Sequence, residues 1–183
     1  MRAVLTLLVL AAAGGAAYLA WGAPYRPGSL AWRAVDRDLD TRFADVPTTT
    51  TAALARRLAT VDAPVLLDAR APAEYATSHL PGARRVDPGA DARALADTLA
   101  DVDRERPVVV YCSVGVRSAR VARALREVGF QRVENLEGSV FRWANEGRPL
   151  VDADGRPAAT VHPYDAVWGR LLRPERRAPP DSL

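Results

Sequence analysis

Short apolar runs alternate with helical patterns through the middle of this chain. Two apolar runs, Val65–Leu67 and Val108–Val110, are bounded by polar and turn-forming residues and predict buried strands, and the next strand is expected over Val133–Leu136. The β-branched run Val108–Val110 is typical of a central parallel strand covered on both faces. Apolar residues at helical spacing predict helices over 51–58, 73–77, 91–99, 118–128 and 140–145. This alternation predicts an α/β fold with a doubly wound, mostly parallel sheet in three layers.

The beginning of the chain has a different pattern. After Arg2, no charged residue occurs from Ala3 to Ala23, and leucine, valine and alanine predominate. This run has the length of a membrane-spanning helix, about 20 residues, and exceeds the apolar region of a signal peptide, about 7–15 residues. We therefore expect a hydrophobic helix preceding the domain, with residues 1–23 a transmembrane anchor or a signal peptide. Membrane contact is expected through residues 3–23.

The position of Arg2 indicates which side of the membrane the chain occupies. A basic residue before an apolar segment favours the cytoplasmic side, so the rest of the chain is expected to be exported. In a bacterium this would place it at the periplasmic face of the inner membrane. If the chain is cleaved at the passable signal Ala20-Trp21-Gly22, the remaining protein would be free in the periplasm.

Three further parts follow the apolar segment. Residues 24–47 are expected to form a linker with a short helix, in which Trp32, Val35 and Leu39 recur at helical spacing. Residues 48–150 are expected to form the α/β domain. Residues 151–183 remain as a C-terminal extension.

The extension itself is expected to be only partly ordered. Four apolar side chains are expected to dock on the domain or to lie at the membrane surface: Tyr164, Trp168, Leu171 and Leu172. The polar and proline-rich end, Arg173–Arg177 followed by Ala178-Pro-Pro, is expected to be disordered.

Composition excludes several classes of function. A chain of 183 residues with 49% hydrophobic residues can bury one ordinary core without disulfides or a structural metal. The net charge is only +3, and the basic residues, all arginine, are scattered, so we expect no nucleic-acid partner. One cysteine cannot form an intramolecular disulfide, and with two histidines it gives too few ligands for a zinc site. We expect no metal and no cofactor.

The single cysteine, Cys112, is the strongest candidate for chemistry. It follows the apolar strand directly and precedes a turn containing Gly115 and the start of a helix. Backbone N–H groups and the positive end of a helix favour a thiolate or a bound anion there. Arg117 would add a fixed cation, and Ser118 is expected to cap the helix. The alternative is that Cys112 is an ordinary buried residue of the core.

Three ordered blocks resemble the rhodanese-type sulfurtransferases. The loop Cys112-Ser-Val-Gly-Val-Arg117-Ser118 is similar to the family's Cys-x-x-Gly-x-Arg-Ser. Leu66–Arg70, Glu74-Tyr75 and Ser78–Ala83 resemble its first signature, and Val133–Ser139 with Trp143, Gly147 and Pro149-Leu150 resembles its closing signature. Two positions depart from the pattern. Ser78 replaces a frequent glycine, and Ser139 puts a side chain beside the active loop where glycine is common.

The resemblance implies that Cys112 carries sulfur as a persulfide. The backbone of Ser113, Val114, Gly115, Val116, Arg117 and Ser118 would then bind an anionic donor such as thiosulfate. A thiol or cyanide would accept the sulfur. The Cys-x4-Arg spacing favours this chemistry over that of related phosphatases and arsenate reductases, which have Cys-x5-Arg. An exported module that binds or senses persulfide without efficient turnover remains an alternative.

Four upstream residues are assigned supporting roles. Arg70 and Glu74, four residues apart, are expected to form an ion pair with each other. The resemblance suggests that Asp68 anchors the turn through backbone hydrogen bonds. His79 precedes the turn Leu80-Pro81-Gly82, so a structural hydrogen bond is expected of it rather than proton transfer.

Overall fold

The computed structural model describes residues 24–179, so the expected anchor or signal at residues 1–23 lies outside the described residues. Between residues 24 and 179, no helix combines the length and the apolar character needed to cross a membrane. In chain order the elements are α2 (Leu30–Arg42), β1 (Thr48–Thr49), α3 (Thr51–Leu58), β2 (Val65–Asp68), α4 (Pro72–Thr77), β3 (Arg84–Arg85), α5 (Ala92–Thr98), β4 (Val108–Tyr111), α6 (Val116–Glu127), β5 (Val133–Leu136), α7 (Ser139–Asn145), and the 3₁₀ turns η1 (Trp168–Leu171) and η2 (Pro174–Arg176).

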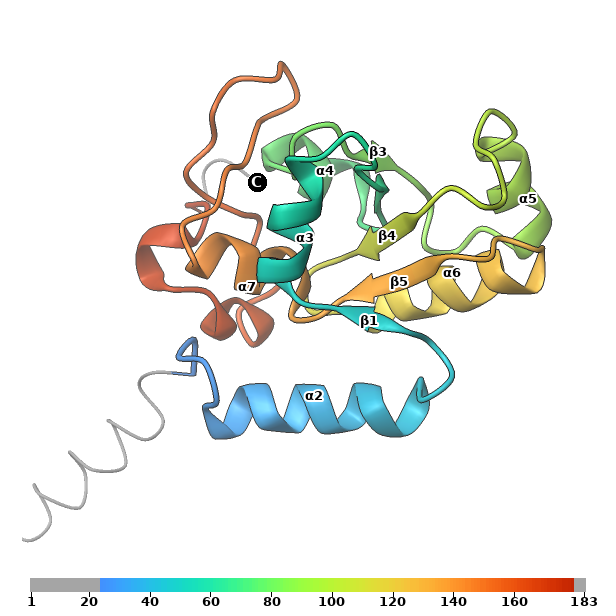
Figure 1. Cartoon of the computed structure of the whole chain (residues 1–183). Helices are drawn as coiled ribbons and strands as arrows, with labels where there is room; N and C mark the ends of the chain where they lie inside the picture. The colour runs from blue at the N-terminus through green and yellow to red at the C-terminus, as the bar shows by residue number, and fades with distance from the viewer. Residues whose placement is uncertain (1–23, 180–183) are drawn as a thin grey trace, which may run out of the picture.

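The strands form one parallel sheet, which confirms the predicted fold class. Their order is β1-β5-β4-β2-β3, with β4 at the centre (Figure 1). All four residues of β4 are buried, as expected for a central strand with both faces covered. Parallel strands direct their carboxyl ends to the same edge, and Cys112 follows β4 at that edge.

Two hydrophobic clusters cover the two faces of the sheet. Because side chains alternate along a strand, Val109 and Tyr111 pack on one face, with side chains of α3, α7 and the C-terminal extension. Val110 and Cys112 lie in the other cluster, with side chains of α5 and α6. Helices on both faces give the three layers that the sequence predicts.

Strands β1 and β3 were not predicted from the sequence. Each has only two residues, threonines in β1 and arginines in β3, so neither produces an apolar run. Their pairing comes from neighbouring strands, because β1 pairs with β5 and β3 pairs with β2. Both lie at an edge of the sheet, where polar strands are common.

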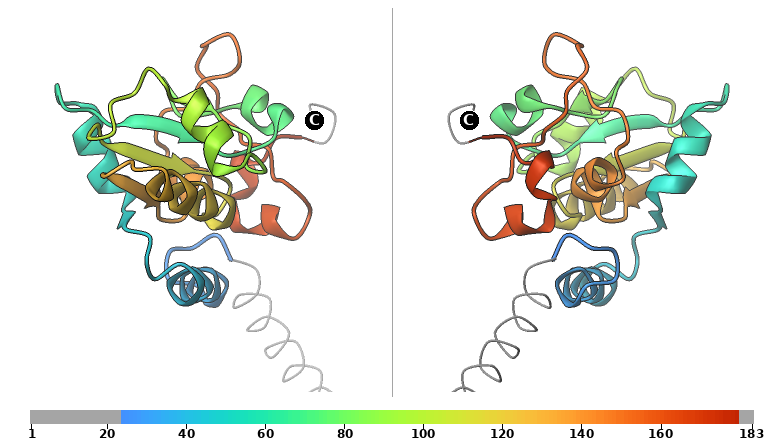
Figure 2. Two further views of the ribbon diagram at one scale, coloured as in Figure 1. Left: turned by 90° about the vertical axis from the view of Figure 1, so that its right-hand side faces the viewer. Right: turned by 90° about the vertical axis from the view of Figure 1, so that its left-hand side faces the viewer.

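Helix α2 is longer than the short linker helix expected. Ser29 caps it, since its hydroxyl accepts the Trp32 N–H. The helix runs alongside the sheet near β1 (Figures 1 and 2). Trp32 is 1% exposed within the first cluster, and Leu39 packs on the second. The linker helix is therefore part of the packed domain.

The C-terminal extension docks on the domain, and more of it is ordered than expected. Leu171 and Leu172 are buried as predicted, and Asn145 Nδ2 donates to the Leu171 carbonyl at 2.7 Å. The prediction of disorder after Leu172 was wrong for the residues up to 178. The Ala178 N–H donates to the Val161 carbonyl at 2.9 Å, and Ala178 is buried. Backbone hydrogen bonds therefore order a segment whose polar composition predicts disorder.

Candidate active site

A sharp turn carries the chain from β4 into α6. Gly115 has φ +121° and ψ −13°, a conformation that residues with a side chain rarely adopt. It is the N-cap of α6, so the expectation that Ser118 caps the helix was wrong. Ser118 is instead the third helical residue, and its hydroxyl lies 2.7 Å from Asn135 Oδ1. The turn leaves the first N–H groups of α6 near the thiol.

The Cys112 thiol lies on the floor of this turn. The residue is 1% exposed, and the Gly115 N–H donates to its Sγ at 3.1 Å. Burial alone would raise the pKa of the thiol. The Arg117 charge and hydrogen bonding from Ser118 and Gly115 outweigh it, so the pKa of Cys112 lies below its ordinary value. The site therefore favours a negative sulfur.

Ser139 anchors the backbone of Cys112. The Cys112 N–H donates to Ser139 Oγ at 3.1 Å, and the Val140 N–H donates to the Cys112 carbonyl at 3.1 Å. Ser139 has φ +49°, a conformation in which glycine is more usual. The side chain that replaces the family's glycine does not crowd the loop. It supplies an acceptor for the N–H of Cys112.

Arg117 forms an ion pair with Glu74, for which Arg70 was the partner predicted from the sequence. Its Nη1 and Nη2 each lie 2.7 Å from an oxygen of Glu74, and Ser113 Oγ lies 2.9 Å from Nη2. The expected pair between Arg70 and Glu74 was therefore wrong. Burial would raise the pKa of Glu74, but its bonds with Arg117 and the Ala71 N–H outweigh burial and lower the pKa. Glu74 and Arg117 are both ionised.

Arg70 pairs with Asp68 instead. Arg70 Nε lies 2.8 Å from Asp68 Oδ1 and Nη2 lies 2.6 Å from Oδ2, while Nη2 also donates to the Ser78 carbonyl. Both side chains are completely buried. Burial alone would lower the pKa of Arg70, but Asp68 raises it above its ordinary value. Asp68 thus holds the turn through Arg70, whereas its carboxylate was expected to accept hydrogen bonds directly from backbone N–H groups.

His79 is not among the residues that line the Cys112 pocket, and it packs against Tyr75 of α4. Its Nδ1 is 3.0 Å from the Tyr75 carbonyl, and its ring stacks on the Tyr75 ring at 3.8 Å between centroids. The His79 N–H donates to the Val151 carbonyl at 2.8 Å. These contacts are of the structural kind that the sequence predicts.

Asn135 supports the turn from the neighbouring strand, and sequence reasoning missed it. Its Nδ2 donates to the Gly115 carbonyl at 3.1 Å, and the side chain is buried. The available signal was an amide side chain in the expected strand β5, which pairs with the strand that leads to Cys112. Buried amides of this kind require hydrogen-bond partners, and the loop provides them.

A pocket of about 290 Å³ opens over Cys112. Five of its lining residues were not predicted as site residues: Asp38, Arg42, Arg120, Tyr164 and Trp168. They come from α2, α6 and the C-terminal extension. The Arg117 guanidinium carbon lies 4.9 Å from the centre of the Tyr164 ring. The parts before and after the expected domain therefore help to build the site.

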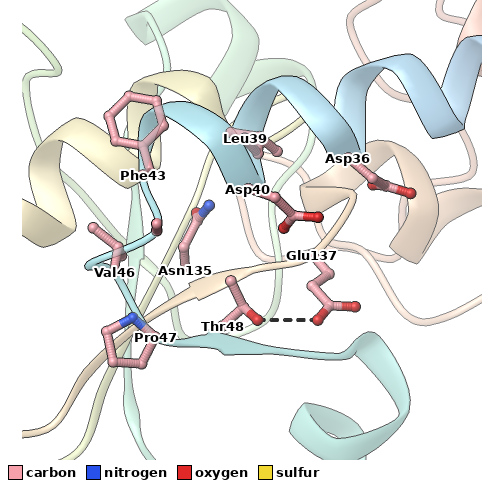
Figure 3. A pocket seen from close by; sticks show the side chains of 10 residues that line it. Asp36, Leu39, Asp40, Phe43, Val46, Pro47, Thr48, Asn135 and Glu137 are labelled. Atoms are coloured by element: carbon pink, nitrogen blue, oxygen red, sulfur yellow. Dashed lines mark hydrogen bonds between the residues drawn. The ribbon is translucent and has the colours of Figure 1, made fainter.

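A larger cavity, about 560 Å³, lies between α2 and strands β1 and β5 (Figure 3). It does not include Cys112, and its lining carries the carboxylates of Asp36, Asp40 and Glu137. Arg142 lies 3.0 Å from Asp36 and 3.9 Å from Glu137, so two of these carboxylates are paired, and no thiol lines this cavity. The smaller pocket over the thiol is therefore the candidate active site.

A cysteine loop lies at the carboxyl edge of the parallel sheet, with a paired arginine beside it, so the chain falls in the class of parallel α/β domains that carry their site at this edge. Comparison with known proteins identifies the class further. The Rhodanese-like domain family matches residues 50–146, so the chain belongs to the rhodanese-like domain family.

Similar proteins bear names that agree with this family. A sulfurtransferase of Allochromatium vinosum is 33% identical over 102 residues, which cover 56% of this chain and 92% of that protein. A thiosulfate sulfurtransferase GlpE of Actinobacillus pleuropneumoniae is 36% identical over 88 residues, covering 48% and 78%. The crystal structure of the BH2092 protein of Bacillus halodurans has the same fold, with TM-score 0.53 and 21% identity over 68% of this chain and 86% of that one.

Proposed function

We propose that this chain is a rhodanese-type sulfurtransferase that carries sulfane sulfur on Cys112. The observation that supports this most is the Gly115 N–H, 3.1 Å from Sγ, in a loop where the thiol pKa is lowered despite full burial. A persulfide carries its negative charge on the terminal sulfur, so it needs hydrogen-bond donors and a nearby cation. Gly115 and Ser118 supply hydrogen bonds to the sulfur, and Arg117 supplies the cation.

The reaction proceeds in two displacements at sulfur. The Cys112 thiolate attacks the terminal sulfur of an anionic donor such as thiosulfate, and the S–S bond of the donor breaks. Sulfite leaves with the electron pair, and a persulfide remains on Cys112. A thiol or cyanide acceptor then attacks the outer sulfur and releases the Cys112 thiolate. Both steps need only a stabilised thiolate and a bound anion.

Intact-mass measurement tests the carrier directly. After treatment with thiosulfate and removal of excess donor, the protein is expected to gain the mass of one sulfur atom, and cyanide is expected to remove it as thiocyanate. Cys112→Ser should show no gain. Rapid turnover with cyanide supports an enzyme, whereas a stable adduct with negligible turnover supports the binding or sensing module. If no donor adds sulfur to Cys112, the proposal fails.

The alternative that this chain is related in activity to phosphatases or arsenate reductases can be tested on the same protein. The shorter Cys-x4-Arg loop suits a single sulfur atom better than a tetrahedral oxyanion. Hydrolysis of an aryl phosphate, without sulfur transfer from thiosulfate, would reverse this assignment.

We further propose that the domain is exported and held at the membrane by residues 1–23. Support comes from the uncharged run Ala3–Ala23 and from Arg2 before it. After expression of the full chain in a bacterium, the protein should remain in the membrane fraction through an alkaline carbonate wash. It should also be degraded by protease added to spheroplasts. Recovery in the periplasmic fluid without residues 1–23 would favour the cleaved signal, and protection from the protease would contradict export.

A further inference from the structure

Four of the ten residues that line the Cys112 pocket lie outside the segment that matches the family. Residues 50–146 supply the loop and α6. Asp38 and Arg42 of α2, together with Tyr164 and Trp168 of the extension, complete the lining. The shape of the pocket therefore depends in part on segments outside the family match, and substrate selectivity can arise there.

The charges in this pocket leave one arginine available. Arg117 is paired with both oxygens of Glu74, and Arg42 lies 2.8 Å from Asp38. Arg120 is exposed, lines the same pocket, and makes no ion pair with any described residue. Arg120 therefore adds positive charge to the pocket beyond that of Arg117 and Arg42. An incoming anion is attracted to this charge.

The remaining walls are aromatic and apolar. Trp168 is half-buried against the first hydrophobic cluster, and Tyr164 is half-exposed over Arg117. Val116 belongs to the same lining. The pocket volume of about 290 Å³ is near the lower end for sites that bind small organic molecules, roughly 300–1,000 Å³. An inorganic anion alone would leave most of these walls uncovered.

The aromatic wall is held in place by its own loop. Asp165 Oδ1 accepts the N–H groups of Val167 and Trp168, each at 2.8 Å. The Tyr164 N–H donates to His162 Nδ1 at 3.0 Å, and Tyr164 has φ +67°. A residue held in this uncommon conformation indicates that the loop has a defined shape before any ligand binds. The wall is thus preorganised.

We propose that this pocket selects a small organic anion that carries the sulfane sulfur, rather than thiosulfate itself. This inference rests on the proposed function of Cys112. The apolar group of the donor packs against Trp168 and Tyr164, and its anionic end lies by Arg120. For an organic thiosulfonate, the Cys112 thiolate attacks the terminal sulfur and the donor S–S bond breaks. The sulfinate leaves with the electron pair, and the persulfide forms on Cys112.

Rates of Cys112 sulfuration test the aromatic wall. The full chain is treated with thiosulfate, methanethiosulfonate or benzenethiosulfonate, and the gain of one sulfur is followed by mass spectrometry. Each rate is divided by the rate of free cysteine with the same donor, which removes intrinsic reactivity. Benzenethiosulfonate is expected to exceed methanethiosulfonate by about tenfold, since the phenyl group buries apolar area against the wall.

Variants of the wall distinguish selection from general damage. Trp168→Ala is expected to bring the ratio of the two thiosulfonates close to one. Tyr164→Asn should reduce the same ratio, and asparagine tolerates the positive φ at this position. If the tryptophan variant does not fold, this second variant still tests the wall. The exposed neighbour Val167, changed to Ala, serves as the control and should leave the ratio unchanged.

Variants of the charge test Arg120. Arg120→Gln is expected to slow all three anionic donors at least fivefold at low salt, with a smaller loss at high salt because mobile ions screen the charge. Arg126→Gln, on the same helix but outside the pocket, should change none of them.

Two results would separate failure of this inference from failure of the proposed function. Equal corrected rates for the thiosulfonates, unmoved by Trp168→Ala, would overturn the selection while leaving Cys112 as the sulfur carrier. If no donor sulfurates the wild-type protein, the carrier itself is refuted.

Discussion

Glu74→Gln is expected to lower the free energy of unfolding by about 2–3 kcal/mol at neutral pH. Glu74 is 3% exposed, and its carboxylate binds Arg117, Ser113 Oγ and the Ala71 N–H. The neutral amide keeps the shape but leaves the charge of Arg117, which is 22% exposed, without its partner. Urea unfolding followed by tryptophan fluorescence measures the loss.

The same variant should show a characteristic pH dependence. The pKa of Glu74 is lowered in the folded protein, so its charge stabilises the fold above the unfolded value of about 4.3. This contribution disappears as the pH falls through the lower, folded pKa. The difference in stability between wild type and Glu74→Gln should therefore be full at pH 7 and shrink below about pH 4.

An exposed glutamate gives the control for this experiment. Glu105 lies in a surface turn, and its change to Gln should cost less than about 0.5 kcal/mol at either pH. A Glu74→Gln variant as stable as Glu105→Gln would show that the pair with Arg117 does not contribute to stability.

The reason that sequence reasoning misassigned Glu74 is geometric. Spacing along the chain predicts partners within one helix, and Arg70 is four residues before Glu74. Arg70 instead lies before α4 in the chain and turns back to Asp68, while Arg117 arrives from α6, which is distant in sequence but adjacent across the sheet edge. Only the folded topology brings Glu74 and Arg117 together.

The buried strands β2, β4 and β5 and the loop after β4 could be predicted because local pattern determines them. An apolar run that ends in a turn containing Gly115 requires no distant partner to be recognised. The pocket walls could not be predicted in this way. Arg42 and Tyr164 lie in segments whose own patterns indicate only a helix and a partly apolar extension. Their place beside Cys112 follows from how α2 and the extension pack.

Ser139 shows the opposite case, in which a departure from the family pattern proves to be a contact. A serine in place of glycine suggested crowding of the loop. Its hydroxyl instead accepts the Cys112 N–H, and the strain of its φ of +49° is offset by that bond. The identity of the residue was visible in the sequence, but the direction of its side chain was not.

Gly115→Ala is expected to disable sulfur transfer and to destabilise the protein together. An alanine at φ +121° is strained by about 1–3 kcal/mol, and its Cβ would come within 2.9 Å of Leu39 Cδ1. The strained turn is expected to shift toward a negative φ, which moves the Gly115 N–H away from Sγ. The pKa of Cys112 should then rise toward the free value of about 8.5, and sulfuration by thiosulfate at neutral pH should slow at least ~10-fold.

Two further variants separate the causes of this loss. Gly129→Ala at the other end of α6 also has positive φ, +96°, but its Cβ meets nothing within 4 Å. It should cost about 1 kcal/mol of stability and leave sulfuration unchanged, because only backbone strain is added. Leu39→Ala in the Gly115→Ala background removes the clash. Recovery of the sulfuration rate would assign the loss to Leu39, and no recovery would assign it to the backbone of the turn. Gly115→Ala with wild-type sulfuration and an unshifted thiol pKa would show that this N–H does not stabilise the sulfur.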